Sequence, residues 1–128
     1  MILLDTDVLI DLLRGQDGAV SWLTSLDAED VFVPGFVVME LIQGCGTRAE
    51  QRRVERALAR YRVVWPKEDT CNSALHVFTA YRLTSGLGIL DAIIGQMAVD
   101  LAAPLATFNR KHYSPFSALR TVQPYARG

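Results

Sequence analysis

The chain has 128 residues, half of them hydrophobic and 21% charged, which is the profile of one folded domain and not of a disordered segment. Its 13 basic and 14 acidic side chains leave a net charge of −1, so the bulk charge indicates no class of partner. The two cysteines lie in no metal-binding spacing, no apolar run approaches the roughly 20 residues that cross a bilayer, and no secretory signal is recognisable. We therefore expect a cytoplasmic protein without a membrane partner.

Short apolar runs alternate along the chain with longer segments whose apolar residues recur at helical spacing. Pro34 is expected at the start of a helix, where its missing N–H costs nothing. In chain order the predicted elements are a strand at 2–4, helices at 7–14 and 19–26, a strand at 31–33, helices at 34–44 and 48–61, a strand at 63–65, helices at 70–84 and 89–102, a strand at 105–107, a loop at 109–117 and a short strand near Val122.

Strands separated by helices require crossover connections, and these make neighbouring strands parallel. The run 31–33 is apolar at every position, as expected of a strand that is covered on both faces. We therefore predict an α/β fold, a single three-layer α/β/α domain over residues 1–128 with a central parallel sheet of about four to five strands.

Four polar side chains lie at or near the ends of the predicted strands. Asp5 directly follows the first strand, Asn109 follows the fourth, and Asp91 lies in the first turn of the helix before the fourth. Glu40 lies roughly two turns into the helix after the second strand. Because parallel strands end at one edge of a sheet, we expect these side chains to converge there. Converging carboxylates repel one another unless a cation binds them, and such hard oxygen ligands favour Mg²⁺, with Mn²⁺ as the alternative.

Glu40 is the only charged residue in the segment 36–42. Burying an unpaired carboxylate is costly, so a buried glutamate here is expected to bind a partner or a metal ion. The alternative is that Glu40 faces water on the polar side of its helix. We favour the functional interpretation.

The other candidates also have structural interpretations. Asp5 could cap the following helix, although Thr6 and Asp7 can do so as well and would leave Asp5 free for a ligand. Asp91 could be an ordinary first-turn acid, and Asn109 an ordinary turn residue. It is the joint placement of these residues that favours a site.

Arginine accounts for 11 of the 13 basic residues, and six arginines crowd into the segment 48–62. The planar guanidinium group suits phosphate, which favours a nucleic-acid partner. A solvated helix face, with Glu50 and Glu55 interleaved, explains the cluster equally well.

With these residues identified, the sequence resembles the PIN-domain ribonucleases and, within them, the VapC-type toxins of type II toxin–antitoxin systems. Four segments carry the resemblance in the family's order and at compatible spacing. They are residues 3–15 (LLDTDVLIDLLRG), 37–44 (VVMELIQG), 90–95 (LDAIIG) and 106–113 (ATFNRKHY).

The resemblance implies an endoribonuclease whose catalytic acids are Asp5, Glu40 and Asp91. These three would hold the metal, with Thr107 and Asn109 supporting it from the fourth segment. It also implies an RNA substrate, a homodimer and a VapB-type antitoxin partner. Two positions depart from the family pattern. Asn109 replaces an acid, which puts a second metal ion in doubt, and Asp7 replaces a frequent Asn.

The implied mechanism is hydrolysis of RNA phosphodiester bonds by a metal-activated water. Three other interpretations are a Mg²⁺-binding phosphorylation-receiver module, a PIN nuclease that is not a toxin, and a binding protein on a degenerate PIN scaffold. A receiver needs an acceptor aspartate at the end of its third strand, where this chain has Trp65 and Pro66. The retained acids argue against the degenerate scaffold. For an antitoxin we expect an apolar surface on the first two helices, formed by Leu9, Leu12, Leu13, Trp22 and Leu26, although a core position is favoured for Leu9 and Leu12.

Overall fold

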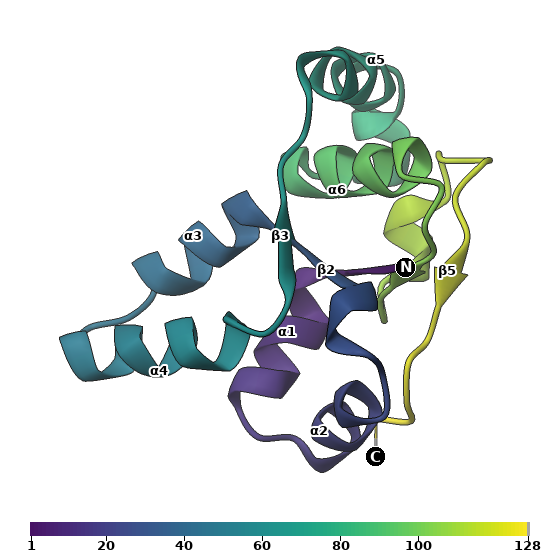
Figure 1. Cartoon of the computed structure of the whole chain (residues 1–128). Helices are drawn as coiled ribbons and strands as arrows, with labels where there is room; N and C mark the ends of the chain where they lie inside the picture. Colours follow the sequence, from purple (N-terminus) through teal and green to yellow (C-terminus); the bar gives the residue numbers. More distant parts are fainter. Residues whose placement is uncertain (128) are drawn as a thin grey trace.

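The computed structural model describes residues 1–127, and Figure 1 shows its arrangement. Its elements are β1 (Ile2–Leu4), α1 (Thr6–Leu13), α2 (Asp17–Thr24), the 3-10 helix η1 (Ala28–Asp30), β2 (Val31–Pro34), α3 (Gly35–Gln43), α4 (Arg48–Leu58), β3 (Arg62–Val64), α5 (Glu68–Ser85), α6 (Ile89–Asp100), β4 (Leu105–Ala106), the 3-10 helix η2 (Arg110–Tyr113) and β5 (Thr121–Val122). No helix within this range is long and apolar enough to cross a membrane.

The sheet has five strands in the order β3-β2-β1-β4-β5, and every neighbouring pair is parallel. Strand β1 is central, with Leu3 paired to Phe32 on one side and to Leu105 on the other. Leu3, Leu105 and Val31 are fully buried, as expected for strands covered on both faces. The predicted α/β class and parallel sheet are confirmed.

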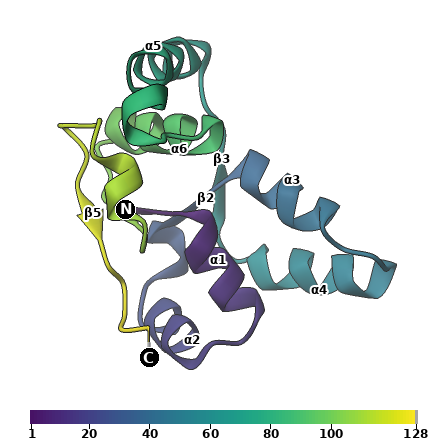
Figure 2. The same ribbon diagram turned by 180° about the vertical axis from the view of Figure 1, so that it is seen from behind.

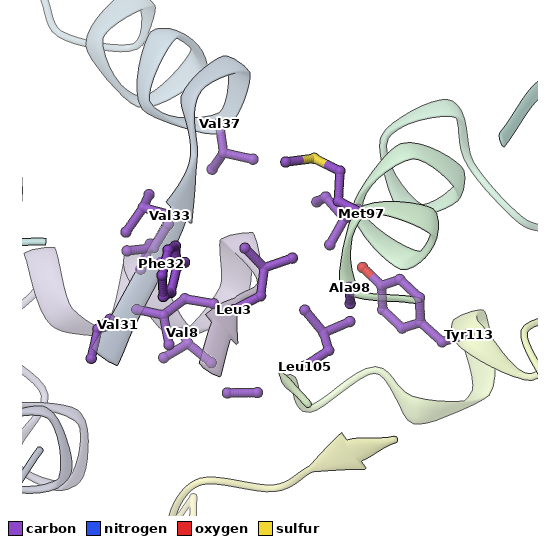
Figure 3. Close-up of a cluster of buried hydrophobic side chains, with 14 of the residues drawn as sticks. Leu3, Val8, Val31, Phe32, Val33, Val37, Met97, Ala98, Leu105 and Tyr113 are labelled. Atoms are coloured by element: carbon purple, nitrogen blue, oxygen red, sulfur yellow. The ribbon is translucent and has the colours of Figure 1, made fainter. Parts of the chain in front are cut away.

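The helices form the outer layers. Figures 1 and 2 show α5 and α6 together on one side of the sheet and α1 and α2 on the opposite side. The close-up in Figure 3 shows the core between them, where side chains of β1 and β2 meet Met97 and Ala98 of α6. The pair α3–α4 differs from the other helices because it projects away from the body as a helical hairpin (Figures 1 and 2).

Tyr125 and Arg127, near the C-terminal end of the described range, connect helices α1 and α2 to the segment that follows β4. The Tyr125 hydroxyl and the Arg127 Nε both donate to Asp11 Oδ2, at 2.9 and 3.0 Å. The Arg127 guanidinium lies 4.1 Å from the centre of the Phe108 ring, and the Tyr125 ring packs against both Phe108 and Trp22. This tail therefore links α1, α2 and the end of β4.

Several predicted boundaries were wrong by a few residues. Pro34 is the last residue of β2 and the N-cap of α3, not a residue inside the helix. Strand β3 ends at Val64 and not at Trp65, and helix α4 ends at Leu58 instead of 61. The predicted loop 109–117 contains η2, and η1 was not predicted. One turn of 3-10 helix is too short to show a hydrophobic period.

Candidate active site

Asp5 lies at the carboxyl end of the central strand and is only 4% exposed. Its Oδ2 accepts two hydrogen bonds, from Thr107 Oγ1 at 2.7 Å and from the Tyr113 hydroxyl at 2.8 Å. Its Oδ1 accepts the backbone N–H of Thr6 at 2.8 Å. Three donors from three parts of the chain therefore fix the orientation of this carboxylate.

The expectation that Asp5 would be free of helix capping was wrong. Asp5 is the N-cap residue of α1, because the chain enters the helix directly from β1, and Asp7 Oδ1 accepts a further first-turn N–H, from Val8 at 2.8 Å. Each carboxylate oxygen has about two acceptor positions. The two hydroxyl groups fill those of Oδ2, whereas Oδ1 keeps one after the bond from Thr6. The oxygen that remains available to a ligand is Oδ1.

Asp91 lies in the first turn of α6, also as a capping acid, since its Oδ2 accepts the backbone N–H of Gly88 at 3.3 Å. The same oxygen lies 3.5 Å from His112 Nδ1, and Oδ1 lies 3.5 Å from the Tyr113 hydroxyl. The Asp91 side chain is 26% exposed, so it faces both the buried cluster and solvent. Both acids thus stand at helix N-termini, where the helix dipole favours negative charge.

Tyr113 joins the two acids, and residue-by-residue reasoning missed it. It is 2% exposed, and its single hydroxyl contacts both Asp5 and Asp91. Burial, together with the nearby charges of these aspartates, raises the pKa of Tyr113 far above its usual range, so the phenol keeps its proton. The only sequence signal was its place at the end of the fourth motif-like segment, and an aromatic residue there is ordinarily interpreted as part of the core.

Asp7 adds a third acid beside this cluster. Its Oδ2 accepts the backbone N–H of Phe108 at 2.9 Å, so α1 is tied to the segment that carries Thr107. Burial raises the pKa of Asp7, and burial followed by the charge of Asp7 raises that of Asp5. The site therefore concentrates buried negative charge with little positive charge inside it.

Thr107 and Asn109 occupy different positions in the site. Thr107 is fully buried and donates to Asp5. Asn109 is exposed, and its backbone N–H donates to Thr107 Oγ1 at 3.0 Å. Asn109 thus holds Thr107 through the backbone, and its side chain faces the solvent side of the cluster.

Glu40 is exposed, so the expectation that it would be buried was wrong, and within residues 1–127 it forms no close group of three acidic, histidine or cysteine side chains with Asp5 and Asp91. It is exposed on α3 and lines a hollow of about 390 Å³ together with Leu13 and Arg53. Glu40 is five residues beyond the start of α3, which at 1.5 Å per residue carries it roughly 7 to 8 Å from the edge of the sheet. Because α3 projects from the body, even its apolar neighbour Met39 is exposed.

Within residues 1–127, no three acidic, histidine or cysteine side chains lie close enough to hold an ion between them alone. Mg²⁺ and similar ions, however, usually keep several waters and bind to one or two carboxylates. The oxygens of Asp5, Tyr113 and Asp91 share one hydroxyl proton, which leaves an excess of negative charge. This set of hard oxygen donors fits a hydrated divalent cation held by Asp5 and Asp91.

Comparison with known proteins shows the family to which this fold belongs. Residues 2–115 match the PIN domain family. The chain is 37% identical over 122 residues to Ribonuclease VapC10 of Mycobacterium tuberculosis strain H37Rv, covering 94% of this chain and 91% of that protein. It is similar to a toxin-antitoxin complex from Klebsiella pneumoniae (TM-score 0.77, 26% identity, 98% of both chains). It is also similar to FitAcB from Neisseria gonorrhoeae (TM-score 0.78, 25% identity, 97% of this chain and 98% of that one). The chain belongs to the PIN-domain family.

Proposed function

We propose that this protein is a divalent-metal-dependent endoribonuclease, that Mg²⁺ is its metal, and that it acts as the toxin of a toxin–antitoxin pair. The observation that carries the proposal is the pair Asp5 and Asp91, joined through Tyr113 at the carboxyl edge of the sheet. The relative named Ribonuclease VapC10 supports RNA as the substrate. The toxin-antitoxin neighbour supports an antitoxin partner of the VapB type.

In this proposal the chain's own residues prepare the site before substrate binds. Asp5 would hold the cation through Oδ1, because Thr107 and Tyr113 occupy Oδ2. Asp91 would hold it together with Asp5 and, being partly exposed, is also accessible to water. When bound, a divalent cation supplies the Lewis-acid chemistry that activates water and polarises a phosphodiester. His112, beside Asp91, is placed to contact the phosphate or leaving group at the rim.

Glu40 and Asn109 complete the proposal as residues that act from the solvent side. The Glu40 carboxylate is exposed on a helix that begins where β2 ends, at the same edge of the sheet as Asp5. We assign it the role of a third acid that acts on the metal or its water. The exposed Asn109 amide can bind water or a phosphate oxygen but adds no charge.

The antitoxin surface expected on α1 and α2 is partly closed in this structure. Leu9 is fully buried in the core, and the Trp22 ring lies against Tyr125 of the same chain. Leu13 instead lines the hollow beside Glu40 and Leu41. We propose that an apolar antitoxin segment binds near this end of α1 and that the toxin itself is a homodimer.

The first test is chelation. EDTA should stop RNA cleavage by the purified protein and added Mg²⁺ should restore it, because the chain has no cysteine–histidine set to retain zinc. Asp5→Asn should lower cleavage by at least about 100-fold, since it removes a charge that holds the cation. Asp30→Asn, the same change at an exposed position, should leave the rate unchanged.

Two outcomes would contradict the proposal. Cleavage that persists after exhaustive chelation would indicate a metal-free mechanism, and a near-normal rate in Asp5→Asn would remove the site assignment. Toxicity is tested separately, by measuring bacterial growth. Expression of the unmodified chain should slow bacterial growth, whereas expression of Asp5→Asn should not, and equal growth would leave a nuclease that is not a toxin.

A further inference from the structure

Helix α4 carries a row of arginines along one face, with the acid Glu55 beside it. Arg48, Arg52 and Arg56 are four residues apart, so they lie in one row along the helix, and Arg53 borders it. All four are exposed. The opposite face turns inward, where Leu58 is buried and Val54 packs against the core. The row therefore points away from the α3–α4 contact and into solvent.

The acids of α4 do not neutralise this row. Glu50 folds back to accept the backbone N–H of Gly46 at 3.0 Å, and Glu55 accepts from the side chain of Gln51 at 3.0 Å. The ion pairs found within residues 1–127 involve His112 and Arg127 and none of the α4 arginines. Arg60 and Arg62, by contrast, lie over the rings of neighbouring aromatic residues. The row is thus charged and exposed, and none of its arginines forms an ion pair within residues 1–127, although Glu55 lies beside it.

The surface beside the row is hollowed and polar. Arg48 and Arg52 line an open hollow of about 650 Å³ together with Thr47, Gln51 and one acid, Glu55, whose carboxylate accepts from Gln51. A bound protein segment would need apolar side chains to bury, and this hollow offers almost none. Guanidinium forks, a hydroxyl and an amide are instead the donors that bind phosphate oxygens.

The row is also connected to the proposed active site. Arg53, at its border, lines the same hollow as Glu40 on the facing side of the helical hairpin. An RNA strand bound along the row would therefore cross α4 at Arg53 to reach the residue that we assign as the third acid.

We propose that the Arg48–Arg52–Arg56 row binds the phosphate backbone of single-stranded RNA and so holds the substrate beside the cleavage site. This inference rests on the proposed ribonuclease function and adds the surface that binds the RNA outside the reacting phosphate. Contacts to phosphates carry no sequence information, so the row would supply affinity and register and not base specificity.

The test measures binding alone. Fluorescence anisotropy with fluorescein-labelled oligouridylate, in EDTA and in the Asp5→Asn background, excludes cleavage. The logarithm of the affinity falls with the logarithm of salt concentration by about 0.7 for each single-strand phosphate that is neutralised. Arg52→Gln/Arg56→Gln should therefore reduce the magnitude of this slope by about 1.4, and by the same amount for oligoadenylate. Glutamine keeps the helix propensity of arginine.

Two control proteins separate the explanations. Arg82→Gln/Arg120→Gln removes two exposed arginines elsewhere and should leave the slope unchanged. Arg52→Lys/Arg56→Lys keeps both charges and should also keep the slope. An unchanged slope in the glutamine variant overturns the proposal, and so does a reduced slope in the lysine variant, which would mean damage to α4. Absence of RNA binding by the parent protein would instead count against the ribonuclease function.

Discussion

The cluster at the end of β1 and the α3–α4 hairpin contribute to the proposed site in opposite ways. In the cluster, Asp5 and Tyr113 are buried and every carboxylate oxygen of Asp5 and Asp91 has a hydrogen-bond contact. In the hairpin, Glu40 and the arginines are exposed. A group that positions a metal must be held rigidly, whereas one that meets a long polymer must reach into solvent. Under the proposed function, the body of the protein would position the metal and the projecting helices would contact the RNA.

Among the variants that test this comparison, the largest loss of cleavage is expected for a change at Tyr113. Tyr113→Phe removes only the hydroxyl that joins Asp5 to Asp91, and it should lower cleavage by roughly 10- to 100-fold, the range for residues that orient metal ligands. It should also weaken Mn²⁺ binding, measured by titration calorimetry, because Asp5 loses one of the two donors on Oδ2. Loss of a hydrogen bond to a carboxylate should lower the free energy of unfolding by about 2 kcal/mol.

One result would contradict this role of the Tyr113 hydroxyl. If Tyr113→Phe loses stability but binds Mn²⁺ as tightly as the unmodified chain, the hydroxyl only fills the core and does not position the acids. Phe116→Leu, a change in a core aromatic that forms no such contact, serves as the control for a general loss of packing.

The next effect is expected at Glu40. Glu40→Gln should lower cleavage by roughly 5- to 30-fold, because a charge interaction of an exposed side chain is worth about 1 to 2 kcal/mol. Its melting temperature should stay unchanged, since substitutions of exposed side chains rarely matter to stability. A wild-type cleavage rate would show that Glu40 has no part in the chemistry. A large loss of stability would show that α3 packs differently from the structure described.

The smallest effect is expected at Asn109. Asn109→Ala should lower cleavage by less than about tenfold, because the residue holds Thr107 through its backbone N–H, which alanine retains. Asn109→Asp should tighten Mn²⁺ binding by adding a charge beside the site. Steady-state kinetics and a metal titration of the two variants decide this. A loss in Asn109→Ala as large as that in Asp5→Asn would make the side chain a primary ligand.

The sequence alone predicted the fold class well because each central strand is apolar at every position and is followed by a helix. Asp5 and Asp91 could be chosen because they follow or precede strands whose ends must meet in a parallel sheet. Tyr113 could not, because its partner Asp5 is 108 positions away and nothing local marks a tyrosine as a hydrogen-bond donor to it. The exposure of Glu40 could not be predicted from the sequence for a different reason. Its apolar neighbours predict a buried helix, but α3 leaves the body, and only the tertiary arrangement shows this (Figure 1).

The position of β1 at the centre of the sheet has a consequence for synthesis on the ribosome. Asp5 is synthesised well before β4 and Tyr113, which complete its surroundings and lie 100 and more positions later in the chain. Until they leave the exit tunnel, β1 has an unpaired edge and Asp5 lacks both hydroxyl donors. A nascent chain that lacks β4 and Tyr113 therefore cannot assemble the cluster, and the proposed nuclease activity requires that both have been synthesised and folded.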